Sequence, residues 1–127
     1  MKIEKILIVE DSIISRNLLI HSIPDAENYS IREAEDGQRA WYEVQRFQPD
    51  FIILDINMPN VNGWSFLEQI RSENISTPVL VVTTEVIIEE RLKYFGVLAY
   101  IKKPIHKNQM HKIFEKLAHY ENSAPLV

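Results

Sequence analysis

Three short apolar runs rich in β-branched residues constrain the fold of this chain more than any other feature. They span Ile6–Val9, Phe51–Leu54 and Val79–Val82. Runs of this length without polar alternation are typical of parallel strands that are buried on both faces. The chain has 127 residues, of which 46% are hydrophobic, enough for one domain with a single core. We expect a domain over residues 1–121 and a short flexible tail at residues 122–127.

Weaker strand patterns and amphipathic segments fill the intervals between these runs. Tyr29–Ala34 alternates polar and apolar residues, as an edge strand does, and Ala99–Lys102 is a further predicted strand. Apolar residues recur at about 3.6 positions in the predicted helices, which are Ile13–His21, Gln38–Phe47, Trp64–Arg71, Ile88–Phe95 and Lys107–Tyr120. This alternation predicts an α/β fold: a doubly wound five-stranded parallel sheet with helices on both faces.

Composition excludes several classes of protein. There is no cysteine, so disulfide frameworks, thiolate zinc sites and cysteine nucleophiles are excluded. The net charge of −4 is a poor basis for direct nucleic-acid binding. No apolar run approaches the ~20 residues of a membrane span, and the charged start is unlike a signal peptide. We expect a cytoplasmic protein with no direct nucleic-acid or membrane partner.

Polar side chains stand where the predicted strands end. Glu10 and Asp11 follow the first strand, Asp55 the third, Thr83 the fourth and Lys103 the fifth. In the flavodoxin-like strand order 2-1-3-4-5 the first and third strands are adjacent, so the three acids converge. Clustered carboxylates stay ionised beside a cation, and oxygen-only ligands suit Mg²⁺ or Mn²⁺. A carboxylate held there can be the nucleophile that forms an acyl phosphate.

Four motifs at these strand ends together resemble one family. They are Glu10-Asp11, the segment from Asp55 to Gly63, Thr83-Thr84 and the segment from Tyr100 to Pro104. In this order they resemble the response-regulator receiver domain, the CheY-like fold of two-component signalling, from Ile6 to about Tyr120. The resemblance implies a phosphorylation-regulated signalling protein rather than an enzyme with a separate substrate. Its partners would be a histidine kinase or phosphotransfer protein and a downstream protein that the sequence does not identify.

The resemblance also implies a magnesium site. Asp11, Asp55 and the backbone carbonyl of Asn57 would ligate Mg²⁺ (or Mn²⁺), and Glu10 would act through a bound water. Taken singly, an acid at a strand end also fits a helix cap, and Asp11 or Ser12 could cap the first helix.

Further roles follow from the same resemblance. Asp55 would be the phosphoacceptor, Thr83 and Lys103 would contact the phosphoryl group, and Tyr100 would be the rotating aromatic of the output switch. The family's lysine immediately precedes proline through a cis peptide bond, so Lys103 is the matching lysine, and strand alternation directs Lys102 to the opposite side. Asn57 and Glu85 are similar to the residues of members with a short-lived aspartyl phosphate.

There are three alternative functions. A magnesium-dependent phosphatase of the haloacid dehalogenase type needs a second acid two residues after its nucleophile, where Asn57 stands. A nucleotide or flavin binder needs a Gly- or Ser/Thr-rich loop after the first strand, where Glu10-Asp11-Ser12 stands. A receiver that docks to partners without being phosphorylated remains open.

The segment from Thr83 to Gly96 departs from the family, because it is shorter than usual and contains the apolar run Val86–Ile88. One interpretation is a shorter helix with a hydrophobic staple. The other is an exposed patch that favours a homodimer or partner docking through the fourth helix, fifth strand and fifth helix. Both interpretations stay open.

Helical spacing also predicts core residues. Trp41, Phe47, Phe66, Leu67 and Ile70 are expected in the core, and the four histidines are expected on the surface.

Overall fold

Five parallel strands form one sheet in the computed structural model, which describes residues 2–58 and 62–122. Along the chain the elements are β1 (Lys5–Val9), α1 (Ile13–Ser22), the 3₁₀ turn η1 (Ala26–Asn28), β2 (Ser30–Ala34), α2 (Gly37–Phe47), β3 (Phe51–Asp55), α3 (Gly63–Ser72), β4 (Val79–Thr83), α4 (Glu89–Phe95), β5 (Ala99–Lys102) and α5 (Lys107–Asn122). The strand order is β2-β1-β3-β4-β5. The predicted doubly wound α/β fold is therefore confirmed.

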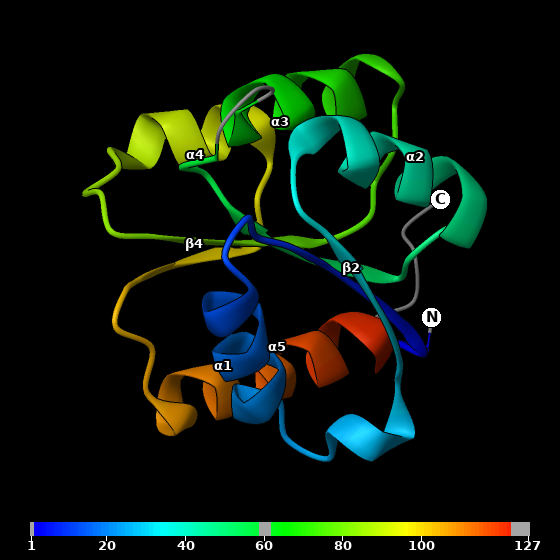
Figure 1. Cartoon of the computed structure of the whole chain (residues 1–127), viewed down its shortest axis with the longest axis vertical. Coiled ribbons are helices and arrows are strands. Elements are labelled where there is room, and N and C mark those ends of the chain that lie inside the picture. The colour runs from blue at the N-terminus through cyan, green and yellow to red at the C-terminus, as the bar shows by residue number, and fades with distance from the viewer. Residues whose placement is uncertain (1, 59–61, 123–127) are drawn as a thin grey trace.

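Helices cover both faces of this sheet. Figure 1 shows α2, α3 and α4 on one face and α1 and α5 on the other. Successive side chains of β1 enter opposite layers: Leu7 and Val9 pack on the side of α2 and α3, and Ile6 and Ile8 on the side of α1 and α5. All residues of β3 and β4 are buried. This two-sided burial explains why these strands read as unbroken apolar runs.

The predicted core positions differ in how deeply they are buried. Phe66, Leu67 and Ile70 of α3 are buried, as predicted. Trp41 and Phe47 of α2 are only partly buried, so neither lies in the core interior, although Trp41 packs against the core cluster. Cations of Lys5 and Arg32 lie 5.7 and 4.9 Å from the Phe47 ring centroid. Helical periodicity predicts which face is apolar, but it does not give the width of the buried stripe.

Side-chain caps begin three of the helices. The side chains of Ser12, Asp36 and Asn62 accept a backbone N–H from the first turn of α1, α2 and α3. In contrast, α4 follows Ile88, which has no side-chain cap. Because Ser12 caps α1, the carboxylate of Asp11 is left to the site described below.

Predicted boundaries of the elements agree with the structure to within one or two residues, although η1 was not predicted. The last helix continues to Asn122, and residues 123–127 of the predicted tail lie outside the described residues, as does Pro59. All four histidines are exposed, as expected. Among the described residues, no helix combines the length and apolarity that crossing a membrane requires.

Candidate functional site

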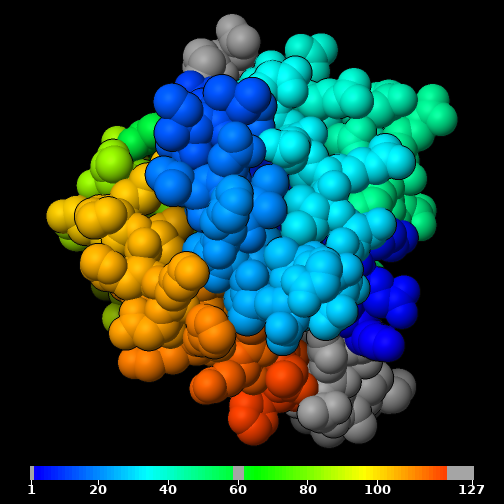
Figure 2. All heavy atoms as spheres, turned by 60° about the horizontal axis from the view of Figure 1, so that its bottom comes forward, coloured from blue at the N-terminus to red at the C-terminus, as the bar shows by residue number. Residues whose placement is uncertain are grey.

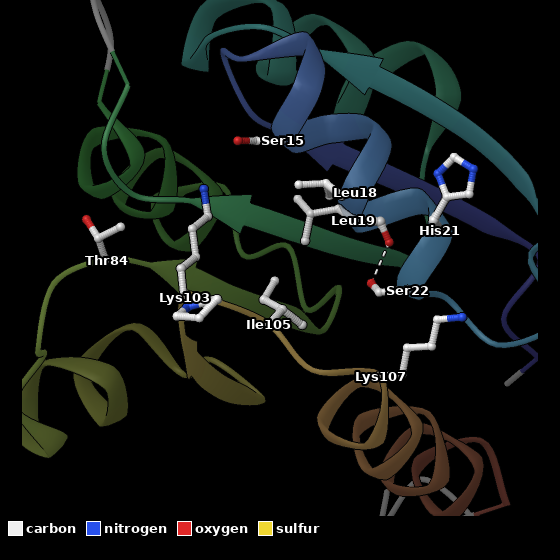
Figure 3. A pocket seen from close by; sticks show the side chains of 10 residues that line it. Ser15, Leu18, Leu19, His21, Ser22, Thr84, Lys103, Ile105 and Lys107 are labelled. Carbon is white, nitrogen blue, oxygen red and sulfur yellow. Dashed lines mark hydrogen bonds between the residues drawn. The ribbon is translucent and has the colours of Figure 1, made fainter.

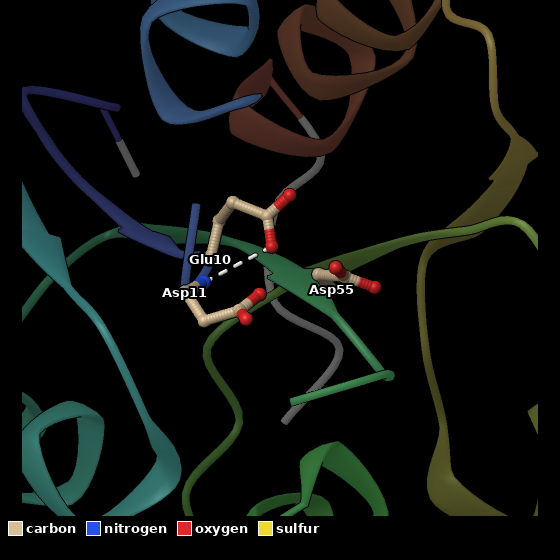
Figure 4. A group of neighbouring side chains, drawn as sticks. All are labelled: Glu10, Asp11 and Asp55. Atoms are coloured by element: carbon tan, nitrogen blue, oxygen red, sulfur yellow. Dashed lines mark hydrogen bonds between the residues drawn. The ribbon is translucent and has the colours of Figure 1, made fainter. Parts of the chain in front are cut away.

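Three carboxylates meet at the carboxyl edge of the sheet. Glu10 and Asp11 follow β1 and Asp55 ends β3, and these strands pair directly, with Val9 opposite Leu54. One carboxylate oxygen from each acid lies within 4.8 Å of the others. Figure 4 shows the three side chains next to one another. Glu10 and Asp55 are buried and Asp11 is exposed, so the cluster is open to solvent on the side of Asp11. The structure thus brings together the acids whose convergence the sequence predicted.

Lys103, the residue after β5, neutralises part of this charge. Lys103 Nζ donates to Glu10 Oε1 at 2.7 Å and to Asp55 Oδ2 at 3.3 Å. Burial raises the pKa of Glu10 above its ordinary value, with the Asp55 carboxylate acting in the same direction. Burial lowers the pKa of Lys103, but its bonds to the two acids outweigh burial and raise that pKa. Lys103 therefore stays a cation.

The local chain at Lys103 agrees with the expected motif. The Lys103–Pro104 peptide bond is cis. Lys103 N donates to the carbonyl of Thr83 at 2.8 Å, which holds the end of β5 against the end of β4. Lys102 is exposed.

Hydrogen bonds connect Asp55 to Tyr100. Asp55 Oδ1 accepts from Asn57 N at 3.0 Å, and Asn57 Nδ2 donates to Thr83 Oγ1 at 3.3 Å. Thr83 Oγ1 also accepts from Glu85 N at 3.2 Å, and the Tyr100 hydroxyl donates to the Glu85 carbonyl at 2.6 Å. A continuous chain of contacts therefore runs from the end of β3 to β5.

One residue of the site was missed from the sequence. Arg16 Nη1 donates to the carbonyls of Glu10 and Asp11 at 2.7 and 3.3 Å. Arg16 Nε donates to Glu33 Oε1 at 2.9 Å. The only sequence signal was an arginine on the first turns of the helix after Asp11, with an acid near the end of the adjacent strand.

The donor chemistry of the cluster fits a hard divalent cation. All the clustered side-chain donors are carboxylate oxygens, and the chain has no cysteine. Oxygen donors with an open, solvated side suit Mg²⁺, which keeps several waters when bound. Asn57, whose carbonyl was predicted as a ligand, lies exposed in the loop two residues after Asp55.

Comparison with known proteins decides the family. The family model described as "Response regulator receiver domain" matches residues 6–115. This chain belongs to that family. Receiver domains act in two-component signalling, bind Mg²⁺ through acidic residues, and interact with histidine kinases or phosphotransfer proteins.

Curated relatives share the receiver domain and differ in what else they carry. The chain is 38% identical over 106 residues to protein-glutamate methylesterase/protein-glutamine glutaminase 1 of Syntrophus aciditrophicus, covering 79% of this chain and 30% of that protein. It is 32% identical over 104 residues to transcriptional regulatory protein PhoP of Escherichia coli K12, covering 80% of this chain and 46% of PhoP. The chain therefore spans less than half the length of these relatives.

A solved receiver structure aligns over most of the chain. Chemotaxis response regulator CheY4 of Vibrio cholerae superposes with a TM-score of 0.79 at 32% identity, covering 91% of this chain and 98% of CheY4 in a crystal form grown at low pH. The response regulator domain of Thermotoga maritima CheB gives 0.78 at 26% identity, covering 98% and 100%. Both comparisons agree with the fold described above.

A groove of about 500 Å³ on this receiver domain reaches Lys103. Figure 2 shows α1 in blue beside the yellow-to-orange segment that leads from β5 into α5. Leu18 and Ser22 of α1 line one wall, and Lys103 and Ile105 line the other (Figure 3). Leu18 is 66% exposed. The groove therefore offers apolar surface that reaches the lysine of the site.

Proposed function

We propose that this receiver domain takes a phosphoryl group from a histidine kinase or phosphotransfer protein onto Asp55 and thereby changes its partner binding. The observation that carries the proposal is the position of the Asp55 carboxylate. This carboxylate accepts from the Lys103 ammonium, which also donates to Glu10, and one of its oxygens lies within 4.8 Å of oxygens of Glu10 and Asp11, in a cluster open to solvent on the side of Asp11. An acceptor carboxylate needs this combination of a neutralising cation and access for the donor.

The side chains present divide the work of phosphoryl transfer. An Asp55 oxygen would form the new bond to phosphorus while the bond from phosphorus to the donor's imidazole nitrogen breaks, and that nitrogen keeps the electron pair. The contacts to Lys103 Nζ and Asn57 N fix the carboxylate plane. Each carboxylate oxygen retains a second lone pair for the reaction. Lys103 can then neutralise charge on the incoming phosphoryl oxygens.

Asp11, Asp55 and the Asn57 carbonyl would hold Mg²⁺, with Mn²⁺ as an equivalent ion. When bound, this ion supplies positive charge that screens the carboxylate and the phosphoryl oxygens from one another. Both oxygens of Glu10 already have donors, Lys103 Nζ on Oε1 and the backbone N–H of Asp11 on Oε2. This arrangement supports a contact of Glu10 with the ion through a water.

Thr83 and Tyr100 would convert phosphorylation into a change of surface. Thr83 Oγ1 accepts hydrogen bonds from Asn57 and Glu85 in this structure. If Thr83 turned to donate to the phosphoryl group, it would lose these contacts and release the backbone of Glu85. Because the Glu85 carbonyl is also the acceptor for Tyr100, the ring of Tyr100 would lose its partner as well. The protein would then populate a conformation in which Thr83 and Tyr100 have changed contacts, and a downstream protein that prefers this conformation would bind more tightly.

Several finer proposals accompany this function. Asn57 cannot donate the proton that a phosphatase of the haloacid dehalogenase type requires, so we propose no activity on a separate substrate. Asn57 and Glu85 together support a short-lived aspartyl phosphate. Val86 and Ile88, 78% and 65% exposed, support a homodimer or a downstream partner on the face formed by α4, β5 and α5. We assign residues 1–121 to the receiver domain.

Incubation with Mg²⁺ and acetyl phosphate, followed by intact-mass measurement, tests the proposal. The wild type should gain one phosphoryl group, EDTA should block the gain, and Asp55→Asn should abolish it. Asp36→Asn is the matched control, because Asn keeps the cap of α2 and leaves the site intact. A folded wild type that binds Mg²⁺ but gains no mass would overturn the proposal and favour docking without phosphorylation.

A further inference from the structure

We propose that Arg16 is a positioning residue that aims the acidic loop after β1 at the metal. This inference rests on the magnesium site of the proposed function. This role is additional to any contribution of Arg16 to folding, and it involves no contact with the phosphoryl group. Arg16 is the side chain through which α1 and β2 set the direction of Asp11.

The guanidinium of Arg16 is held on two sides. Its Nε donates to Glu33 Oε1 on β2 at 2.9 Å. Its Nη1 donates to the carbonyls of Glu10 and Asp11 at 2.7 and 3.3 Å. Only 15% of the Arg16 side chain is exposed, whereas its partner Glu33 is 43% exposed. The rigid, planar fork of arginine joins three acceptors that come from two different segments of the chain.

The bonds from Arg16, together with two others, hold the backbone of Glu10 and Asp11 in place. Glu10 N donates to the carbonyl of Ala34 at 3.0 Å, and Asp11 N donates to Glu10 Oε2 at 3.0 Å. Arg16 takes the two carbonyls, so both N–H groups and both C=O groups of Glu10 and Asp11 have partners. Because the Asp11 side chain is exposed, its direction depends on its backbone rather than on packing around the carboxylate. Outer partners that orient a ligand change metal affinity about 10–100-fold when they are removed.

The charge of Arg16 and its positioning role predict opposite changes in Mg²⁺ affinity when Arg16 is replaced. The guanidinium is a cation behind an acidic cluster, so by Coulomb's law its removal should strengthen the binding of another cation. If Arg16 positions Asp11, its removal should weaken Mg²⁺ binding despite the more negative site. Arg16→Lys also distinguishes charge from geometry, because lysine keeps the charge but its single nitrogen cannot reproduce the planar fork. Charge alone predicts an unchanged affinity for Mg²⁺ in this variant, whereas the loss of positioning predicts a weaker one.

Magnesium titration of the full chain by calorimetry, without phosphodonor, tests the inference. We expect Arg16→Gln and Arg16→Lys each to raise the Kd for Mg²⁺ about tenfold. The matched control is Arg46→Gln, whose arginine lies over the Tyr42 ring on α2, away from the site. This control should leave the Kd unchanged. Unfolding in urea, measured in the same buffer without Mg²⁺, shows whether each variant is folded.

Each outcome decides the inference. Folded Arg16 variants with a wild-type or lower Kd would overturn it and leave the guanidinium a purely structural or electrostatic role. If Arg16→Gln does not fold, Arg16→Lys and Glu33→Ala give the answer. Glu33→Ala frees the guanidinium without touching the carbonyls and should raise the Kd by less than loss of the fork does. An unchanged Kd in both Arg16→Lys and Glu33→Ala would also overturn the positioning role of Arg16.

Failure of the magnesium site itself has a separate signature. Asp11→Asn in an otherwise wild-type chain should abolish or strongly weaken binding, whatever Arg16 does. A wild type without measurable Mg²⁺ binding would overturn both the metal site and the role of Arg16. Binding that depends on Asp11 but not on Arg16 would overturn only the role of Arg16.

Discussion

Consecutive helices on one face of the sheet, α3 and α4, are held in different ways. α3 begins at the cap of Asn62 and buries Phe66, Leu67 and Ile70 in the core. α4 is a helix of seven residues that has no side-chain cap and no buried residue. The loop that follows Asp55 and contains Asn57 leads into the firmly anchored helix, and the segment after Thr83 leads into the loosely held one. The site is thus built on rigid elements, and the expected output surface lies on an element that opens locally at low cost.

Aromatic and cationic side chains provide much of what holds α4 to α3. The rings of Trp64 and Phe95 lie 5.4 Å apart, and the guanidinium of Arg91 lies 3.6 Å from the Trp64 ring centroid. Arg71 lies 3.9 Å from the ring centroid of Tyr94. Exposed cation–π contacts contribute about 0.5–1 kcal/mol each. These contacts lie at the edge of the core, so they can rearrange without opening it.

Truncation of one phenylalanine in each helix gives the largest expected contrast. Phe66 is fully buried, so Phe66→Ala should lower the free energy of unfolding by about 3–5 kcal/mol. Phe95 is only partly buried at the edge, so Phe95→Ala should cost about 1 kcal/mol, the size of an aromatic pair. Urea denaturation followed by circular dichroism measures both. Equal losses would show that α4 is anchored as firmly as α3.

Two glycines sharpen the same contrast at an intermediate size. A Cβ at Gly63 would lie 2.7 Å from Ile56 Cα and 3.1 Å from the carbonyl of Asp55. Gly63→Ala must therefore displace the backbone next to the acceptor, and we expect a loss of about 1–3 kcal/mol together with slower phosphorylation by acetyl phosphate.

Gly96, which ends α4, is the counterpart. Its φ of 65° disfavours alanine, but nothing lies within 4 Å of the added Cβ. Gly96→Ala should cost about 1 kcal/mol and leave the phosphorylation rate unchanged. If phosphorylation were slower in Gly96→Ala than in Gly63→Ala, the end of α4 would matter more to the acceptor than the start of α3, which would contradict this contrast.

The sequence predicted the strand ends well and the support around them poorly. Buried parallel strands are short apolar runs, so the first polar residue after each run locates Glu10, Asp55 and Thr83 at one edge of the sheet. The role of Arg16 was not predictable in this way, because it depends on where Glu33 of β2 lies relative to α1. Pairing of β1 with β2 places them together, and no local pattern contains that information.

The apolar run before α4 was the feature that the sequence left most open. The structure separates its members: Ile87 packs against the core cluster on the α3 side, whereas Val86 and Ile88 are exposed. Hydrophobicity alone could not assign these neighbours, because a staple and an exposed patch require the same residue types. The structure thus assigns Ile87 to packing and leaves Val86 and Ile88 exposed.

A new cap on α4 gives the smallest expected effect and tests the contrast most directly. Ile88 has φ −72° and ψ 144°, the extended backbone that an N-cap residue adopts, but its side chain makes no capping bond. Ile88→Ser should cap the helix and Ile88→Ala should not, although both remove the same exposed apolar group. We expect the α4 amides to be more stable against hydrogen exchange in Ile88→Ser by about 0.5–1 kcal/mol, with little change in global unfolding because α4 opens locally. Identical exchange in the two variants would mean that the start of α4 is already satisfied, and the loose helix would have to be explained by its missing core residues alone.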